Sequence, residues 1–324
     1  FSIGGGFSTL DQFTLIADIT EGNFLGRGYL ARIRGQVGGR RTLGTITFRN
    51  PRIFDSLTSA QVDIFRSDTN FITYREKRVG TNLTFGQGFS EYLSGTVSLV
   101  AEKIDISDID SDAPDIIFDQ AGKQSTTGFR ATLFRDSRDF YIDPRQGSRM
   151  GIRTSLGTEY LGGSNSFYSV SFDALKFFPL PFWDFRISTR GRIGYGSAFS
   201  GEDYPLSEFF FVGGINTVRG FKFGRAGSVT DSNDPEGGNK QLIWNNDLIF
   251  PLLPDAKLNG VLFFDYGEGF AEGDKLSLNL RQAAGFEIRW ISPFGPLRAA
   301  YGYNLKPRSG EKSAVFEFSV GSVF

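Results

Sequence analysis

The chain has 324 residues, with 41 glycines and 35 phenylalanines but neither cysteine nor histidine. Its 35 basic and 36 acidic residues nearly balance, which argues against a general nucleic-acid binder, because such a protein needs surplus cations to neutralise phosphates. Without cysteine or histidine, a Ser–His–Asp triad and the usual zinc ligand sets are excluded, so we expect no enzyme, no cofactor and no metal site.

The chain contains no run of about 18 apolar residues, so we predict no membrane-spanning helix. It opens directly on FSIGGGF, which already alternates and does not have the pattern of a signal peptide. We therefore expect an excised or processed form, a single domain over residues 1–324.

Apolar and polar residues alternate along most of the chain, which is typical of β-strands with one face in an apolar medium. In FRISTRGRIGY, for example, Phe185, Ile187 and Ile193 alternate with Arg186 and Arg192. The segments number about sixteen, and an even number lets a barrel close with both ends on one side. They begin near Phe1, Gln12, Gly28, Thr42, Ser56, Val79, Leu93, Thr126, Ser148, Ser166, Trp183, Lys240, Lys257, Leu280, Pro296 and Ser313.

Alternation alone would also fit a soluble β-sandwich. Three features favour lipid outside: strands of roughly 9 to 13 residues suit a tilted bilayer crossing, aromatic residues cluster near strand ends, and tight turns alternate with longer polar loops. The arginine-bearing face must then look into a wet lumen. We predict an all-β fold, a transmembrane antiparallel β-barrel of about 16 strands with a long, inward-folded sixth loop.

The first and last strands, which must pair to close such a barrel, contain interior glycines. These are Gly4, Gly5, Gly6 and Gly321. Glycine weakens strand packing, so this seam should be the weakest ladder, with Ile3 to Gly5 facing Phe318 to Val320. The same glycines would also suit bulges or curvature of the strands.

An acidic loop lies between Ile104 and Gln120. Its candidate ligands are Asp108, Asp110, Asp112 and Asp119. Their spacing approaches that of a calcium loop, but Ala113 and Pro114 stand where the required glycine turn should be. We therefore favour a solvated acidic loop over a Ca²⁺ site, and we expect no convincing helix in the chain.

A second long loop, residues 200–239, contains FFFVGGINTVRGFKF. This stretch is too apolar for disorder, so we expect it to fold back into the barrel mouth. Arg219 would there lie in a partly dry lumen and would need carboxylate partners, which Asp247 and Asp265 on the next strands can supply. The alternative is an ordinary surface loop cation.

The INTVRGF stretch resembles the VRGF/Y signature in the sixth loop of the outer-membrane barrel assembly family, which includes BamA, TamA, two-partner secretion transporters and organellar import barrels. The motif residues are Val218, Arg219, Gly220 and Phe221. Further stretches resemble the same family in the same order: GNFLGRGY, FRNPRIF, FRDSRDFYIDPRQGSRM, and GFEIRWISPFGPLRAAYGYNL followed by VFEFSVGSVF.

The resemblance implies a sixteen-stranded barrel in the outer membrane of a Gram-negative bacterium, with Arg219 held by Asp247 and Asp265. Asp247 stands where BamA commonly carries the longer glutamate. Family members also carry periplasmic POTRA domains before the barrel, which are absent from this sequence and through which accessory lipoproteins would dock. The implied function is a protein insertase whose partners are unfolded outer-membrane β-barrel clients and outer-membrane lipids.

In that function the seam opens as a lateral gate, and an incoming strand pairs with the exposed edge of the first strand. The gate residues would be Gly4, Gly5, Gly6, Phe318, Val320 and Gly321, and the barrel's own C-terminal sorting signal would be Phe316, Phe318 and Phe324. Three alternatives stay open: a TamA-type or two-partner secretion translocator, a passive porin, and a barrel-embedded lipid hydrolase, the last disfavoured by the missing histidine.

Overall fold

The computed structural model describes residues 1–199, 201–230, 233–292 and 295–321. Within these residues the alternating segments form sixteen strands, which confirms the predicted fold class. The strands are β1 (Ser2–Ser8), β2 (Gln12–Phe24), β3 (Tyr29–Gly38), β4 (Arg41–Asn50), β5 (Thr58–Asn70), β6 (Arg75–Gly88), β7 (Leu93–Ser107), β8 (Gly122–Asp136), β9 (Gly147–Gly157), β10 (Phe167–Pro179), β11 (Arg186–Ala198), β12 (Lys240–Leu253), β13 (Leu258–Phe270), β14 (Arg281–Ser292), β15 (Gly295–Asn304) and β16 (Ala314–Val320).

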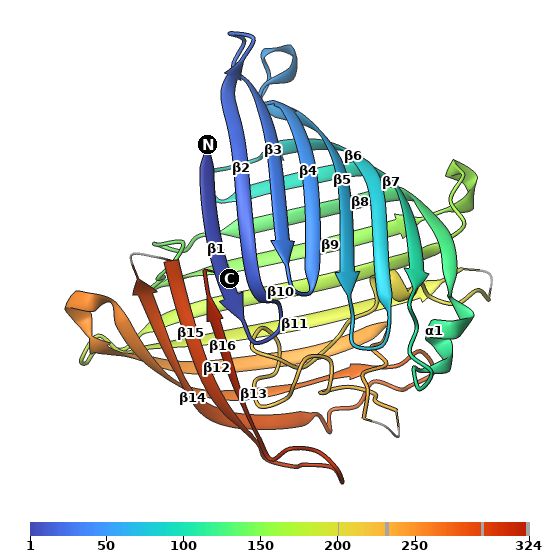
Figure 1. Ribbon diagram of the computed structural model, residues 1–324. Coiled ribbons are helices and arrows are strands. Elements are labelled where there is room, and N and C mark those ends of the chain that lie inside the picture. The colour runs from blue at the N-terminus through green and yellow to red at the C-terminus, as the bar shows by residue number, and fades with distance from the viewer. Residues whose placement is uncertain (200, 231–232, 293–294, 322–324) are drawn as a thin grey trace.

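Each strand pairs with its neighbours in the sequence, and β1 pairs with β16 to close the barrel. Figure 1 shows the first and last strands side by side, coloured blue and red. All of the pairings are antiparallel among the described residues. This is the connectivity expected when every strand is joined to the next by a hairpin.

The expectation of no helix is wrong at a few short segments of the described chain. These are the helix α1 (Asp115–Asp119) and the 3-10 turns η1 (Ile53–Asp55), η2 (Glu159–Leu161), η3 (Leu206–Glu208) and η4 (Pro254–Ala256). Each is too short to show a 3.6-residue period in the sequence. No helix among the described residues is long and apolar enough to span a membrane.

The two faces of the strands differ as the alternation predicts. On β11, Ile187 and Ile193 are exposed on the outer face, whereas Arg186 and Ser188 are buried on the inner face. The outer faces of other strands expose Ile64, Leu99, Phe129, Phe172 and Leu262. An apolar band around a closed barrel is the surface that a lipid environment requires.

The acidic loop, loop 4 (residues 108–121), packs at the end of the barrel beside β7 and loop 6. Asp108 pairs with Arg75 at 3.4 Å, while Asp119 lies in α1. Ile117 of α1 is buried in a cluster with Ile104 and Ile106 of β7 and with Leu206, which lies between β11 and β12. No group of three or more acidic side chains in the described chain is placed to hold a metal ion.

The seam has a different register from the one expected. Phe7 lies opposite Val320 and Ser8 opposite Ser319, so Ile3 to Gly5 do not face Phe318 to Val320. After Val320 the chain leaves the ladder at Gly321, whose φ is +68°. Alternation assigns residues to a face but does not pair one strand with another, so this register could not be inferred from the sequence.

Candidate functional site

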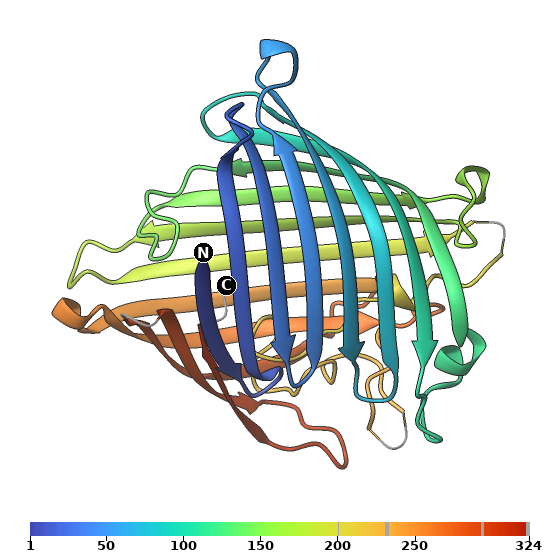
Figure 2. The same ribbon diagram turned by 45° about the horizontal axis from the view of Figure 1, so that its top comes forward.

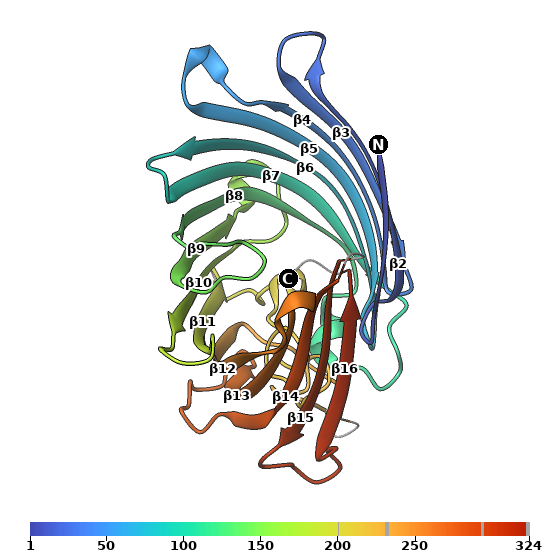
Figure 3. The ribbon, with the colours of Figure 1, turned by 90° about the vertical axis from the view of Figure 1, so that its left-hand side faces the viewer.

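Loop 6 (residues 199–239, with residues 200 and 231–232 outside the description) folds into the barrel. Figures 2 and 3 show its gold ribbon within the ring of strands. Its apolar residues Val212, Val218 and Phe221 are buried and pack with Ile243 of β12 and Ala283 of β14. Burial of this apolar surface explains why a long loop between two strands is ordered.

The first part of loop 6 is held by the opposite wall. Gln120 of loop 4 donates a hydrogen bond to the carbonyl of Tyr204 at 2.9 Å and accepts one from the Leu206 backbone at 2.6 Å. Glu208 accepts a hydrogen bond from Arg130 of β8 at 3.1 Å. Burial raises the pKa of Glu208 above its ordinary value, although Arg130 and Arg78 oppose that shift. Loop 6 therefore spans the lumen between two walls of the barrel.

The guanidinium of Arg219 lies at the centre of a buried ion cluster, with 3% of the residue exposed. It donates to Asp265 through Nε at 2.8 Å and Nη2 at 2.7 Å, and the Arg219 backbone N–H donates to the same carboxylate at 2.9 Å. Its Nη2 also donates to Asp247 at 2.6 Å. The structure thus brings Arg219 together with both carboxylates named from the sequence.

A third carboxylate, Glu287 of β14, accepts from Arg219 Nη1 at 2.6 Å and has no exposed surface. The sequence analysis missed this residue. Its signal was present, since Glu287 is an acid between Phe286 and Ile288 on an alternating strand and therefore faces the lumen. Alternation gives the face of a residue but not its height on the barrel wall, so the convergence was hidden until the register was known.

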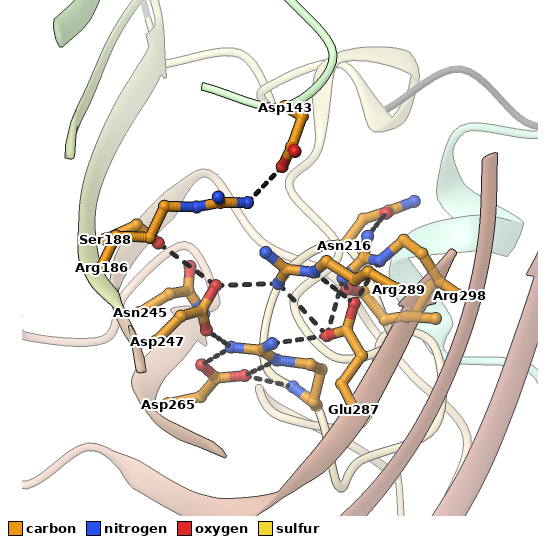
Figure 4. A network of polar contacts seen from close by, with 12 residues as sticks. Asp143, Arg186, Ser188, Asn216, Asn245, Asp247, Asp265, Glu287, Arg289 and Arg298 are labelled. Carbon is orange, nitrogen blue, oxygen red and sulfur yellow. Dashed lines mark hydrogen bonds and ion pairs between the residues drawn. The ribbon is translucent and has the colours of Figure 1, made fainter. Parts of the chain in front are cut away.

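Two more arginines complete the charge balance. Arg289 donates to Asp247 at 2.8 Å and to Glu287 at 2.7 Å, and Arg298 of β15 donates to Glu287 at 2.6 Å. Figure 4 shows these side chains converging from neighbouring strands. Three guanidinium groups face three carboxylates, so the buried cluster carries no excess charge and each ion has partners, as burial of ions requires.

An aromatic ring and a glycine fix the position of the arginine. The Arg219 guanidinium carbon lies 3.8 Å from the centroid of the Phe263 ring, a cation–π contact. The next residue, Gly220, has φ +88°, and a Cβ there would lie 2.9 Å from the Ala283 side chain and 3.2 Å from the Gly302 backbone. Glycine is required at this position because the loop turns where it touches the wall.

Loop 6 also contacts the last strand. The Glu317 carboxylate of β16 lies beside the loop backbone, where a Cβ on Gly214 would be 3.5 Å from its Oε1. Glu317 is buried, and its Oε2 has no hydrogen-bond partner among the described residues. Glu317 was not named from the sequence, although its place between Phe316 and Phe318 assigns it to the inner face. It links the loop that carries Arg219 to one side of the seam.

The seam glycines have unequal roles. A Cβ on Gly6 would lie 2.6 Å from the Val320 carbonyl oxygen, whereas Gly4 has open space around it and Gly5 has ordinary contacts. Gly6 is therefore required by the approach of β16, and so is Gly321, where a Cβ would lie 2.8 Å from the Gly5 carbonyl oxygen. Phe316, Phe318 and Val320 lie on the outer face of β16, and Phe318 contacts the Phe7 ring across the seam. Phe324 lies outside the described residues.

The turn from Ser137 to Gln146 lies within FRDSRDFYIDPRQGSRM, one of the stretches that resemble the family. Asp139 accepts backbone hydrogen bonds from Phe140 and Arg145 at 2.9 Å. Burial alone would raise the pKa of Asp139, but these N–H groups hold it below its ordinary value. Asp143 pairs with Arg186 on the inner wall, as Figure 4 shows. This stretch therefore forms a turn that is held together by Asp139 and reaches the inner wall through Asp143.

Comparison with known proteins agrees with this architecture. The model of the Omp85 superfamily domain matches residues 23–324. The chain is 31% identical, over 99% of its length, to an outer membrane protein assembly factor BamA from Nitratidesulfovibrio vulgaris, and covers 41% of that protein. It is 24% identical, over 95% of its length, to an outer membrane protein assembly factor BamA from Neisseria meningitidis, and covers 45% of it.

Among solved structures, BamA from Haemophilus ducreyi lacking POTRA domains 1–3 superposes with a TM-score of 0.87 at 20% identity, covering 98% of this chain and 69% of that one. The chain spans less than half the length of the two sequence relatives. Since the family model matches nearly all of its residues, this chain belongs to the Omp85 superfamily.

Proposed function

We propose that this chain is the outer-membrane barrel of a protein insertase, which folds β-barrel clients and inserts them into the membrane through the seam between β1 and β16. The observation that carries the proposal is the seam itself. Among the described residues, β16 pairs with Phe7 and Ser8, whereas β2 pairs with β1 along all of Ser2–Ser8. The similarity to proteins named as outer membrane protein assembly factors supports the same conclusion.

The chemistry of such a gate is backbone hydrogen bonding. When the seam opens, the N–H and C=O groups of β1 template a strand of the client, and each added hairpin extends the new sheet. The driving free energy comes from strand pairing and from burial of the client's apolar face in lipid. On this account the protein needs no cofactor and is not an enzyme that makes or breaks covalent bonds.

The partners of this reaction are unfolded β-barrel clients and the surrounding lipids of the outer membrane of a diderm bacterium. Accessory lipoproteins would bind periplasmic domains outside residues 1–324, as the family resemblance implies. In this proposal the Arg219 cluster is the fixed point of the barrel. It locks loop 6 to β12, β13 and β14 while the seam strands separate.

A passive porin is disfavoured by the position of loop 6. A porin needs a water-filled channel, whereas loop 6 crosses this lumen and is bonded to both walls. A secretion translocator of the same superfamily would share the barrel and the loop. It differs in where the client ends, which is beyond the membrane instead of within it.

The test uses the full-length protein in liposomes, presented with a urea-unfolded client barrel. We expect the client to become membrane-embedded and resistant to added protease at a rate several-fold above that in empty liposomes. Equal rates in the two preparations would contradict the proposal. Client recovered in the liposome interior instead of the bilayer would identify a translocator, and steady ion conductance without any client would identify a porin.

A further inference from the structure

A group of cations lies on the outer surface of β5 to β8, near the end of the barrel that carries loops 4 and 6. We call this group the outer cationic rim, and it consists of Arg66, Lys77, Lys103 and Lys123. Their neighbours in sequence, such as Ser67, Glu76 and Glu102, are buried on the inner face. Because side chains alternate along a strand, the four cations point outward.

The register brings the four cations together. Arg66 lies opposite Val79, which lies opposite Lys103 on β7. One row further along, Lys77 lies opposite Asp105, which lies opposite Lys123 on β8. Neighbouring strands are about 4.8 Å apart, so the rim spans the width of a lipid headgroup.

A cavity of about 570 Å³ lies at the rim, lined by all four cations together with Ser125 and Ser164. Asp105 is the one acid among its described lining residues. Below the cavity the same outer face becomes apolar, with Ile64, Leu99 and Phe129 exposed. The surface therefore joins a polar, basic hollow to a hydrophobic wall.

The rim cations outnumber the acids near them. Asp68 and Asp105 lie opposite Lys77, and Asp105 also lies opposite Lys123. Within the described residues no close ion pair joins Arg66, Lys77, Lys103 or Lys123 to a carboxylate, and Asp68 is paired with Arg75 at 2.7 Å. Like charges beside a low-dielectric surface repel one another and attract an anion strongly.

We propose that the outer cationic rim binds the phosphorylated headgroup of an anionic lipid in the leaflet at the loop end of the barrel. The phosphates occupy the cavity, and the acyl chains lie along Ile64, Leu99 and Phe129. This inference rests on the proposed membrane location of the barrel but not on its insertase activity. It commits to a lipid, because the cavity opens directly onto the apolar band.

The experiment measures lipid binding by the full-length protein in neutral detergent, using native mass spectrometry and titration. The probe is a bis-phosphorylated glycolipid, with phosphatidylcholine and inorganic phosphate as separate arms. The variant K77Q/K103Q/K123Q removes three rim charges. The matched control is K176Q, which removes an outward cation next to Phe178 near the opposite end of β10.

We expect the triple variant to lose roughly a hundredfold in affinity for the glycolipid, since each cation near a lipid surface is worth about 1 kcal/mol. The K176Q protein should bind the glycolipid as the native protein does. An unchanged affinity in the triple variant would overturn the proposal. Inorganic phosphate that binds as tightly as the glycolipid would also overturn it, because the site would then recognise a free anion.

Binding in detergent requires no client, so its outcome is separate from that of the insertion test. A protein that binds the glycolipid but fails to insert clients would retain the rim site and lose the proposed function. A protein that inserts clients but binds no glycolipid would support the proposed function and overturn the rim site.

Discussion

At the scale of single residues, Arg219 is the side chain that attaches loop 6 to the inner wall of the barrel. It satisfies three carboxylates on three strands, and its own burial is compensated by five hydrogen bonds from its side chain and backbone. A buried ion cluster adds little net stability when intact, because desolvation offsets attraction. Breaking it is costly, since the remaining ions stay buried without a counter-ion.

The substitution Arg219→Ala should therefore lower the free energy of unfolding by about 3–5 kcal/mol. Urea unfolding of the barrel in a lipid or detergent environment measures this change. Arg27→Ala, in an exposed turn, is the matched control and should change stability by about 0.5 kcal/mol or less. A loss below about 1 kcal/mol for Arg219→Ala would show that the cluster does not hold the loop.

Gly220 offers an independent test that leaves every charge in place. A Cβ at this position meets the Ala283 side chain and the Gly302 backbone, and the backbone is in the left-handed region. We predict that Gly220→Ala destabilises the barrel by about 2 kcal/mol or more. Gly26→Ala, where φ is also positive but the space is open, separates backbone strain from the clash. Equal losses for both variants would contradict the tight contact with the wall.

At the scale of elements, loop 6 joins the fixed wall to the last strand. Glu317 makes this connection, since its carboxylate lies beside the loop backbone at Gly214. A polar contact of this kind contributes about 0.5–1.5 kcal/mol, which is enough to affect the opening of a short strand.

We predict that Glu317→Ala speeds hydrogen exchange of the β16 amides by roughly two- to tenfold, while β7 and β8 exchange as before. Glu317→Gln keeps a carbonyl acceptor and should retain most of the protection. If the β16 amides of the alanine variant exchange at the native rate, loop 6 does not restrain the seam.

The elements also show what the sequence can and cannot predict. Strand starts were predicted within four residues, and the largest differences are Arg75 against Val79 and Gly122 against Thr126. Both strands continue beyond the apolar band, where the two faces are polar and alternation disappears. Asp247 and Asp265 were identified because an acid within an apolar run marks the lumen face. Glu287, Glu317 and the seam pairing required the cross-strand register, which no single strand contains.

At the scale of the whole molecule, the barrel has long, extensively paired strands from β5 to β14 and a short pairing at the seam between β1 and β16. The wall from β5 to β14 has long strands, carries the three carboxylates of the cluster, and is bonded to loop 6 at Glu208 and Arg219. At the seam, β1 and β16 are seven residues each, and Gly6 leaves room for the Val320 carbonyl at the end of β16. Separation of the barrel should therefore begin at the seam, since among the described residues β1 and β16 pair over the shortest ladder.

The most direct measurement is client insertion with the seam locked. Ser8 and Ser319 lie directly opposite one another, and the chain has no cysteine, so Ser8→Cys with Ser319→Cys can form a single disulfide across the seam. The control is Thr84→Cys with Ser98→Cys, an opposed pair between β6 and β7 whose hydroxyl oxygens are 2.8 Å apart.

The account predicts that the oxidised seam pair stops insertion of a client by the full-length protein in liposomes, that reduction restores it, and that the control disulfide has no effect. Insertion that continues at the native rate with the seam disulfide fully formed would contradict the account, because the client would then reach the membrane without the gate.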